Sequence, residues 1–554
     1  MNQTAKADAR TVHLSLETTP CIRSNDLTEK SAAITSKLLT LNHAMYHTRW
    51  KDTFHNHLVH HLLTLWALGA TPAQIQDMWD YNTPYQGSID KRPDKEISSD
   101  LDMKDPATFT RCLGNGDCYL DFLTFFENEI SERGMQEVVK EYVFKGDERA
   151  DDILCRMFTD LLHPIIHLGC GIEFQQPSIV AEALAGACVH ENWPKAFLLP
   201  TEEYVAISKD APSTSLLQVL HSLRQDPEIV SGVKDTDPFN KIPDGFLKRV
   251  TAKQLVPYLG QFQVKPDPED LQRKMLDMMY TTAYMLGAAQ RPGKREAMDF
   301  VTLHCVTVAV FYPAFLAQDW LSDRDKARLL EATARVDAVM YAGCASPVLH
   351  ASCISDYVPR NPNNGWSELF QRAIVYRDEG HAVKLIRALY TLEQLGEPGP
   401  DFPMAKEDCL KLAHMGMDSI ERAFDEVNGN RVSEKIAEGV INRSPQALFS
   451  APAAWLLLAG TSIIINAPLF LAKRAQRREQ FLAKAWLSRL SKLASADVLS
   501  DVHRAAADTI IVLCNGMSGG KHDAAFGDRN TALASRDCVV DQRAMPIGRT
   551  RSLD

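Results

Sequence analysis

Four histidines stand within seven positions at the start of "HNHLVHHLLTLWALGA", residues 55–70. Imidazole binds transition metals and exchanges protons near neutral pH, so this cluster can be a metal site or a catalytic base. Residues three or four apart share one face of a helix, which places His57 beside His60 or His61. A lone buried histidine is more often satisfied by a backbone hydrogen bond than by a metal. The density of the cluster favours a metal without settling the choice.

Three further segments carry histidines in apolar surroundings. "LLHPIIHLGCGIEF" contains His163 and His167, and "DFVTLHCVTVAV" contains His304. "YRDEGHAVKLIRALY" has His381 one turn before Lys384. These segments together predict a metal held inside a helical bundle by histidines from separate helices, and imidazole suits iron, copper, zinc or nickel. Packed core histidines without a metal are the alternative, because neither an HExxH pair nor an ExxH spacing is present.

Sequence motifs for organic redox cofactors are absent. No strand–GxGxxG–helix unit is present for a flavin or a nicotinamide, and no GxxxxGK[ST] loop for a nucleotide. "GMSGG" at 516–520 matches GxSxG, but it opens a polar stretch and lacks the context of a nucleophile elbow. Twelve scattered cysteines without a CxxC pair disfavour structural zinc. An oxidising enzyme with this sequence would therefore keep its redox chemistry in a metal.

The elements that position these residues are predicted to be helices. From about residue 31 to 430, apolar residues recur at three- and four-residue spacing, as in "DLQRKMLDMMYTTAYMLGAAQ". "ATPAQIQDMW" carries a helix start, with Thr71 as the cap, Pro72 in the first turn and Gln74 three residues after the threonine. Strand-like alternation is scarce. The sequence predicts an all-α fold, a large helical domain with a metal site buried between its helices.

The net charge and the N-terminal segment bear on the partners and the location of the protein. The net charge of −11, from 71 acidic and 60 basic residues, argues against a nucleic-acid partner. Residues 1–30 are polar and are expected to be flexible, ahead of a catalytic domain at 31–430. They contain no apolar core of a secretory signal, so we predict a cytoplasmic protein.

The C-terminal part of the chain differs from the rest. Within a helical tail at 431–514, residues 451–472 carry no charge and are followed by "KRAQRR". That length can cross a bilayer with the basic flank on the cytoplasmic side, which makes a single-pass membrane anchor possible. Asn466 and Pro468 favour a buried helix instead. Residues 515–554 are polar and are expected to be disordered.

The four histidine segments, in this order, resemble the motifs of the fungal questin oxidase-like family. The words that carry the likeness are "FHNHLVHHLLTLWALGATPAQIQ", "LLHPIIHLGCGIEF", "DFVTLHCVTVAVF" and "DEGHAVKLIRAL", and it covers roughly residues 35–430. The resemblance implies an oxygenase of aromatic polyketide pathways that uses O2 to open the central ring of an anthraquinone of the emodin or questin type. The products are benzophenone- or xanthone-type compounds, formed in a step described as Baeyer–Villiger oxidation.

The resemblance also implies the residues of the site. One histidine from each motif binds a non-heme iron, Fe2+: His57, His163, His304 and His381. Lys384 joins them as a ligand after carboxylation by CO2, and this anion offsets the charge of the metal in an apolar pocket. Asp378 or Glu379 is the alternative anionic ligand, and a solvent-exposed Lys384 on an amphipathic helix is the simpler alternative.

The other histidines of these motifs are candidates for orienting ligands or for moving protons on the substrate. We take His61 and His167 as the candidate catalytic residues. His55 and His60 are further candidates for the same roles.

Two other functions stay open at this point. An NADPH-dependent Baeyer–Villiger monooxygenase would act on the same class of substrate, although the sequence has no recognisable NADPH-binding motif. A helical scaffold whose histidines are only packed is the non-enzymatic alternative. The metal content of the purified protein separates these functions.

Overall fold

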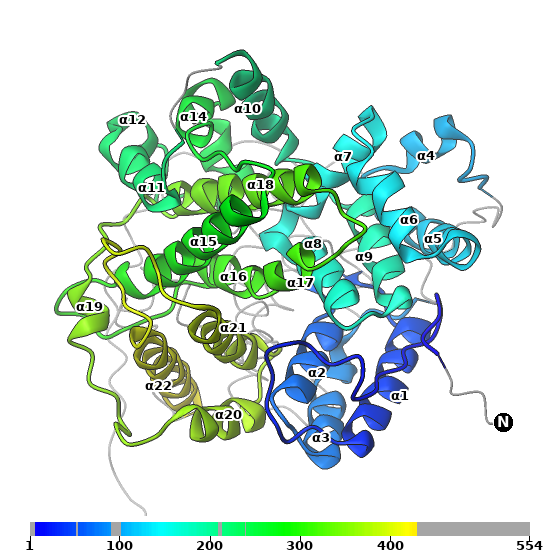
Figure 1. Ribbon diagram of the computed structural model, residues 1–554, viewed down its shortest axis with the longest axis horizontal. Helices are drawn as coiled ribbons and strands as arrows, with labels where there is room; N and C mark the ends of the chain where they lie inside the picture. Colours follow the sequence, from blue (N-terminus) through cyan, green and yellow to red (C-terminus); the bar gives the residue numbers. More distant parts are fainter. Residues whose placement is uncertain (1–5, 51–53, 90–100, 209–212, 239, 429–554) are drawn as a thin grey trace, which may run out of the picture. The chain divides into compact units, whose positions relative to one another are not determined.

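The computed structural model describes residues 6–50, 54–89, 101–208, 213–238 and 240–428. The predicted tail at 431–514, its apolar segment at 451–472 and the C-terminus at 515–554 lie outside these residues. Helices dominate the described part, where the one sheet consists of two short antiparallel strands, so the predicted all-α class is confirmed (Figure 1). No helix in the described ranges is long and apolar enough to cross a membrane.

The helices and strands have the following bounds. The first ten helices are α1 (Glu29–Met45), α2 (Leu58–Ala67), α3 (Pro72–Asn82), α4 (Pro106–Cys112), α5 (Tyr119–Arg133), α6 (Met135–Val139), α7 (Glu148–Met157), α8 (Thr159–Glu173), α9 (Pro177–Val189) and α10 (Lys195–Ile207). The others are α11 (Leu216–Gln225), α12 (Pro227–Val230), α13 (Lys241–Asp244), α14 (Ala252–Leu259), α15 (Pro268–Ala288), α16 (Phe300–Ala309), α17 (Tyr312–Leu316), α18 (Asp323–Gly343), α19 (Ser352–Ser355), α20 (Trp366–Val375), α21 (His381–Leu395) and α22 (Asp408–Asn428). Short 3-10 or π turns are η1 (Thr83–Tyr85), η2 (Gly116–Cys118), η3 (Lys140–Phe144) and η4 (Phe246–Lys248), and strand β1 (Arg49–Trp50) pairs with β2 (Phe54–His55).

The predicted start of α3 is confirmed in detail. Thr71 Oγ1 accepts a hydrogen bond from the Gln74 backbone N–H, and Gln74 Oε1 accepts one from the Thr71 backbone N–H. This reciprocal pair satisfies two of the amide donors that a helix start leaves unpaired. The element is therefore specified by its own first residues.

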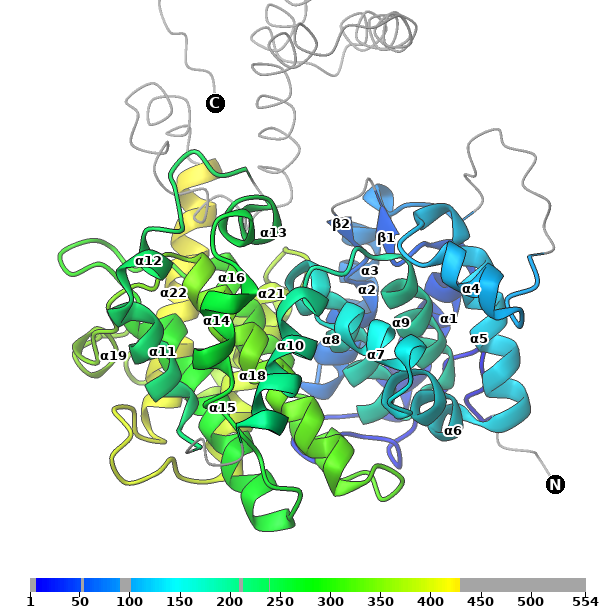
Figure 2. The same cartoon turned by 90° about the horizontal axis from the view of Figure 1, so that it is seen from above.

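Four helices, α2, α8, α16 and α21, form the part of the core that matters for the site. α8 packs against α2 and α16, and α21 packs against the same two helices (Figures 1 and 2). Every residue of α2 is buried, as is α8 from Leu162 to Ile172. A helix that is apolar on all sides belongs inside a large domain, and this explains why the histidine segments read as continuous apolar sequence.

The N-terminal segment departs from its expectation. Val12 and Leu14 are buried, and their backbone N–H groups donate to Thr40 Oγ1 at 3.0 Å and to Ser36 Oγ at 2.8 Å, both on α1. These contacts hold residues 12–14 against α1, and the expected flexibility of the rest of 1–30 stays a prediction. Val12 and Leu14, two positions apart, pack on α1. Because side chains of α1 accept hydrogen bonds from the backbone N–H groups of both residues, the segment packs without secondary structure of its own.

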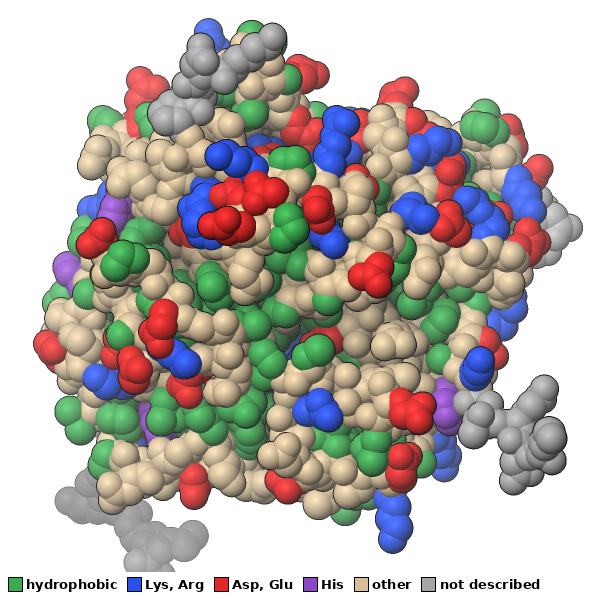
Figure 3. Space-filling model, viewed as in Figure 1, with side chains coloured by type: hydrophobic (Ala, Val, Ile, Leu, Met, Phe, Trp, Pro, Cys, Tyr) green, Lys and Arg blue, Asp and Glu red, His purple; other side chains and the backbone are tan. Residues whose placement is uncertain are grey.

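Acidic and basic side chains are interspersed over the face seen in Figure 3, and few histidines reach it. The histidine motifs are internal: His57, His163, His304 and His381 are all buried. A site built from them is shielded from bulk water, so every charge placed there is felt more strongly than at the surface.

Candidate metal centre

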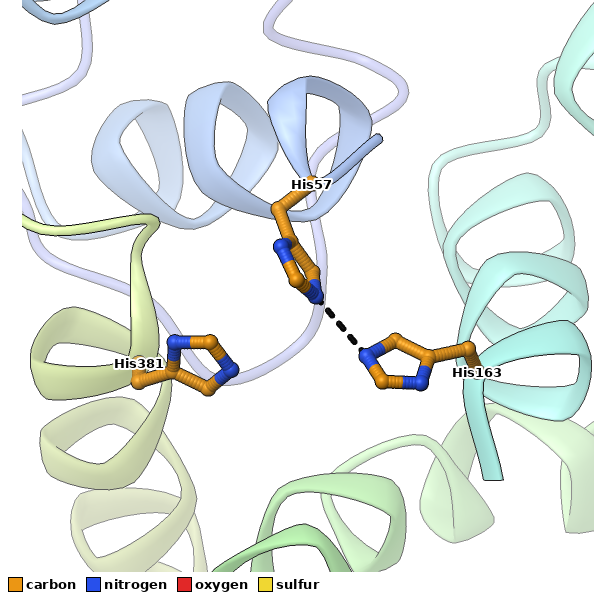
Figure 4. Close-up of side chains that lie close together, drawn as sticks. All are labelled: His57, His163 and His381. Carbon is orange, nitrogen blue, oxygen red and sulfur yellow. Dashed lines mark hydrogen bonds between the residues drawn. The ribbon is translucent and has the colours of Figure 1, made fainter. Parts of the chain in front are cut away.

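The four predicted iron ligands come from four different helices. His57 immediately precedes α2, His163 lies in α8, His304 lies in α16, and His381 is the first residue of α21. Figure 4 shows His57, His163 and His381 directed toward one another. Their positions follow from the packing of α2, α8 and α21, since no two of these three histidines share a helix.

Three of the four imidazole rings are close enough to share one metal ion, and the fourth, His304, lies next to them. Nε2 of His57 lies 2.7 Å from Nε2 of His163. One nitrogen each of His57, His163 and His381 all lie within 4.8 Å of one another. The ring centroid of His304 is 4.9 Å from that of His163 and 5.2 Å from that of His381. The structure thus gathers the four histidines that the sequence singled out.

The outer nitrogens of two of these rings are held by backbone acceptors. His163 Nδ1 donates to the backbone oxygen of Asp160, and His304 Nδ1 donates to that of Phe300 at 2.7 Å. His57 Nδ1 lies 3.0 Å from Glu379 Oε2. A neutral imidazole that donates through Nδ1 keeps a lone pair on Nε2. His163 therefore keeps a lone pair on Nε2, which accepts a hydrogen bond from His57 Nε2–H across 2.7 Å and is the same lone pair that would bind a cation.

Four buried polar atoms of the proposed ligands lack hydrogen-bond partners among the described residues: Nδ1 of His57, which lies beside Glu379, together with Nε2 of His304, Nε2 of His381 and Nζ of Lys384. Leaving such an atom unpaired costs about 1–3 kcal/mol. The Lys384 side chain is only 5% exposed, so the alternative of a surface lysine is wrong. A donor set of imidazoles plus one amine fits a transition metal. A bound cation would satisfy Nε2 of His304, Nε2 of His381 and Nζ of Lys384 together.

Burial keeps the imidazoles of the site uncharged when no metal is present. It lowers the pKa of His57, His163 and His381 well below the usual value, and that of His304 to about 3. Burial also lowers the pKa of Lys384 to about 8, although the nearby Asp378 carboxylate opposes this shift. Neutral imidazoles and a partly neutral amine are the forms that bind metals.

The two candidate anions next to His381 have different surroundings. Asp378 accepts backbone N–H bonds from Gly380 at 2.6 Å and from Ala382 at 2.8 Å, so both of its oxygens cap α21. Glu379 instead lies against His57. Gly380 has φ +85°, and a Cβ there would come within 2.7 Å of His61 Cγ. This turn therefore needs glycine for its backbone and for the space that His61 fills.

The two predicted catalytic histidines occupy different places. His61 packs on Gly380, and its Nδ1 lies 3.3 Å from Asn82 Nδ2. His167 lies farther along α8, with Nδ1 3.1 Å from His60 Nε2 and Nε2 2.7 Å from Glu182 Oε2. Only His61 is directly beside the turn that carries His381.

His55 lies behind His163. The two rings stack with their centroids 4.0 Å apart and an interplanar angle of 7°. His55 Nε2 lies 2.8 Å from Asp160 Oδ2, so Asp160 contacts His55 through its carboxylate and His163 through its carbonyl. His55 and Asp160 together fix the orientation of His163.

Sequence reasoning missed Asp160 and Glu182. Asp160, Leu161 and Leu162 have φ of 45°, 56° and 66°, a left-handed run that costs about 1–3 kcal/mol per residue. This run sets the Asp160 carbonyl against His163, and no local pattern predicts it. Glu182 did leave a signal, because it is the only charged residue in the apolar helix "PSIVAEALAGACV". A buried charge normally has a partner, and here it has two imidazoles.

The pH dependence of stability should carry the signature of His43. Burial alone would lower its pKa, but hydrogen bonds to Glu127 and Glu182 raise it to about 9. The folded protein therefore keeps a proton that the unfolded chain releases near pH 6.5, so this stabilisation is complete below pH 6.5 and is lost toward pH 9. Between pH 6.5 and 8, the metal-free protein should lose about 1–2 kcal/mol more unfolding free energy than His43→Gln. Urea denaturation at several pH values measures the unfolding free energy of both proteins. If the wild type and His43→Gln showed the same pH dependence, the charged contact of His43 with Glu127 and Glu182 would be contradicted.

Comparison with known proteins places the chain in a family. The chain matches the questin oxidase-like family over residues 54–389, a range that includes all four histidines and Lys384. It is 42% identical over 418 residues to "Oxidoreductase AflY" of Aspergillus parasiticus. This alignment covers 74% of this chain and 83% of that protein. It is 39% identical over 409 residues to "Baeyer-Villiger monooxygenase dmxR6" of Cryptosporiopsis sp., with coverages of 72% and 90%. It is 35% identical over 399 residues to "Questin oxidase" of Aspergillus terreus, with coverages of 70% and 88%. The chain belongs to the questin oxidase-like family.

Proposed function

We propose that this oxygenase uses O2 to open the central ring of an anthraquinone at a non-heme iron held by His57, His163, His304, His381 and Lys384. The names of the relatives, which include questin oxidases and Baeyer–Villiger oxidases, support the reaction class. The observation that carries the iron is the convergence of one nitrogen each of His57, His163 and His381 within 4.8 Å of one another inside the core. The alternative of a non-catalytic scaffold is given up, because these relatives are oxidases by name.

Each part of the site has a distinct task in this proposal. A bound Fe2+ would supply the redox capacity to activate O2, which reacts poorly with closed-shell aromatic compounds. The four imidazoles are kept neutral by burial and would hold the ion. Asp378 fixes the first turn of α21 and with it His381. The closed core excludes bulk water from the reacting groups.

Lys384 would supply the negative charge of the ligand set. With a pKa of about 8, roughly a tenth of its amine is neutral at pH 7, far more than for an ordinary lysine. The neutral amine attacks CO2, a C–N bond forms, and one proton leaves the nitrogen, which yields a carbamate anion. Non-heme iron oxygenases commonly include one carboxylate among their ligands, and the carbamate would take that place.

The second candidate is an NADPH-dependent monooxygenase on the same substrates, favoured by the relatives that are named monooxygenases. Its electrons would come from NADPH instead of the phenolic substrate. The two candidates differ in what the purified enzyme consumes, and one assay separates them.

The test is turnover of emodin-type anthraquinones by the purified protein, with metal analysis on the same sample. We expect about one iron per chain and a ring-opened product that carries oxygen from 18O2. O2 consumption without NADPH supports the iron oxygenase, and strict dependence on NADPH supports the second candidate. A folded, metal-free protein with full activity would exclude the iron site. An iron-loaded protein that opens no anthraquinone would exclude the substrate class.

A further inference from the structure

A row of alternating carboxylates and imidazoles connects the surface with the metal centre. Glu127 Oε1 lies 2.9 Å from His43 Nε2, and His43 Nδ1 lies 2.7 Å from Glu182 Oε1. Glu182 Oε2 lies 2.7 Å from His167 Nε2, and His167 Nδ1 lies 3.1 Å from His60 Nε2. The five residues come from α5, α1, α9, α8 and α2, so the row crosses the domain from helix to helix.

The two ends of the row are in different environments. The Glu127 side chain is 12% exposed and pairs at 2.8 Å with Arg10, whose side chain is 52% exposed. His43, Glu182, His167 and His60 are buried. The ring centroid of His60 lies 5.8 Å from that of His57 and 6.3 Å from that of His163. The outer end therefore meets water, and the inner end borders two of the proposed iron ligands.

The hydrogen bonds fix where the protons stand. An ionised Glu182 only accepts, so His43 Nδ1 and His167 Nε2 are both donors. Burial alone would raise the pKa of Glu182, but hydrogen bonds from His167 and His43 hold it at about 2. A neutral His167 then accepts at Nδ1 from His60 Nε2–H, which leaves a lone pair on His60 Nδ1. That atom is buried and has no hydrogen-bond partner within the described part of the chain.

We propose that Glu127, His43, Glu182, His167 and His60 form a proton path between solvent and the buried metal centre. A proton from the site binds His60 Nδ1, the Nε2 proton of His60 moves to His167 Nδ1, and the Nε2 proton of His167 moves to Glu182. His43 then releases its Nε2 proton through Glu127 to solvent. One proton enters the row and one leaves it; Glu182 and His43 both become neutral, so the summed charge of the buried groups is unchanged. The inference rests on the proposed function, because ring opening in a closed site must exchange protons with water.

Glu182→Gln is the decisive variant, because an amide keeps the shape of the side chain but cannot pass on a proton. We expect kcat to fall about 100-fold with unchanged KM and iron content, since a lost proton-transfer group typically costs 10²–10⁴ in rate. The solvent deuterium isotope effect on kcat should rise, because proton transfer becomes rate-limiting. His43→Gln should act in the same direction and serves as the second variant if Glu182→Gln does not fold.

Glu129→Gln is the matched control. Glu129 is also a buried carboxylate on α5, where it accepts hydrogen bonds from Arg133 at 2.9 Å and Tyr142 at 3.2 Å, but it is outside the row. This variant should leave kcat and its isotope effect unchanged. If wild type is active and both Glu182→Gln and His43→Gln keep full kcat with an unchanged isotope effect, the path is overturned while the proposed function stands.

A second measurement does not depend on activity. In 15N-histidine NMR of the metal-free protein at pH 7.5, His43 should appear doubly protonated, assigned by its loss in His43→Gln. The signal should revert to a neutral imidazole in Glu182→Gln. A neutral His43 in the wild type would overturn the path. The wild type can show the signal of doubly protonated His43 while its iron-loaded form oxidises no anthraquinone. In that case the proposed function fails and the hydrogen-bonded row stands.

Discussion

His304→Ala should purify with less than a tenth of the iron of the wild type and with no measurable oxygenase activity. His304 is fully buried, its Nδ1 is tied to the Phe300 carbonyl, and its Nε2 faces the cluster without a partner among the described residues. Loss of a metal ligand or its support typically weakens metal affinity or activity by about ten- to a hundred-fold or more. Iron analysis and an O2-uptake assay on one preparation measure both effects.

His414→Ala is the matched control for this variant. His414 is also buried, it hydrogen-bonds the Asn364 carbonyl through Nε2 at 2.9 Å, and its Nδ1 likewise has no partner in the described ranges. It lies on α22, outside the cluster. The control should lose stability but keep its iron. Full iron and full activity in His304→Ala would remove His304 from the ligand set.

Lys384→Arg should be as inactive as Lys384→Ala. A guanidinium keeps its positive charge and cannot be carboxylated, so it would repel a divalent cation inside the core. Lys384→Glu should retain part of the iron, because it supplies a carboxylate on a shorter arm, but its activity should stay low. A short-chain carboxylic acid added to Lys384→Ala should restore some iron binding by filling the vacated space. Iron content, turnover and their dependence on added bicarbonate are the measurements.

Lys274→Ala tests whether the loss of any buried lysine has the same effect. Lys274 is buried in α15, where its Nζ donates to the Thr214 carbonyl and lies 4.2 Å from the centre of the Phe262 ring. This variant should be less stable than the wild type but should contain a normal amount of iron. If Lys384→Arg is fully active with normal iron, the anionic ligand is to be sought at Glu379, since the oxygens of Asp378 already accept backbone N–H groups.

The sequence alone determined the fold class and the metal-binding histidine candidates. Apolar spacing of three and four residues makes helices by local hydrogen bonding, and Thr71 and Gln74 fix the start of α3 without help from other elements. The histidine-rich segments stood out by composition, and the resemblance to the questin oxidase-like family singled out His57, His163, His304 and His381 among their histidines. The packing of α2, α8, α16 and α21 brings those four rings together. That they bind iron stays a prediction.

Tertiary structure alone decided which other residues meet the site. His43, Glu127 and Glu182 lie on three helices, and their contacts depend on how those helices are rotated about their axes, which the sequence pattern does not fix. The left-handed run that aims the Asp160 carbonyl at His163 is likewise stable only because the surrounding core over-determines it. The burial of Lys384 has the same origin. Spacing placed it one turn from His381, but the enclosure that lowers its pKa to about 8 comes from neighbouring helices.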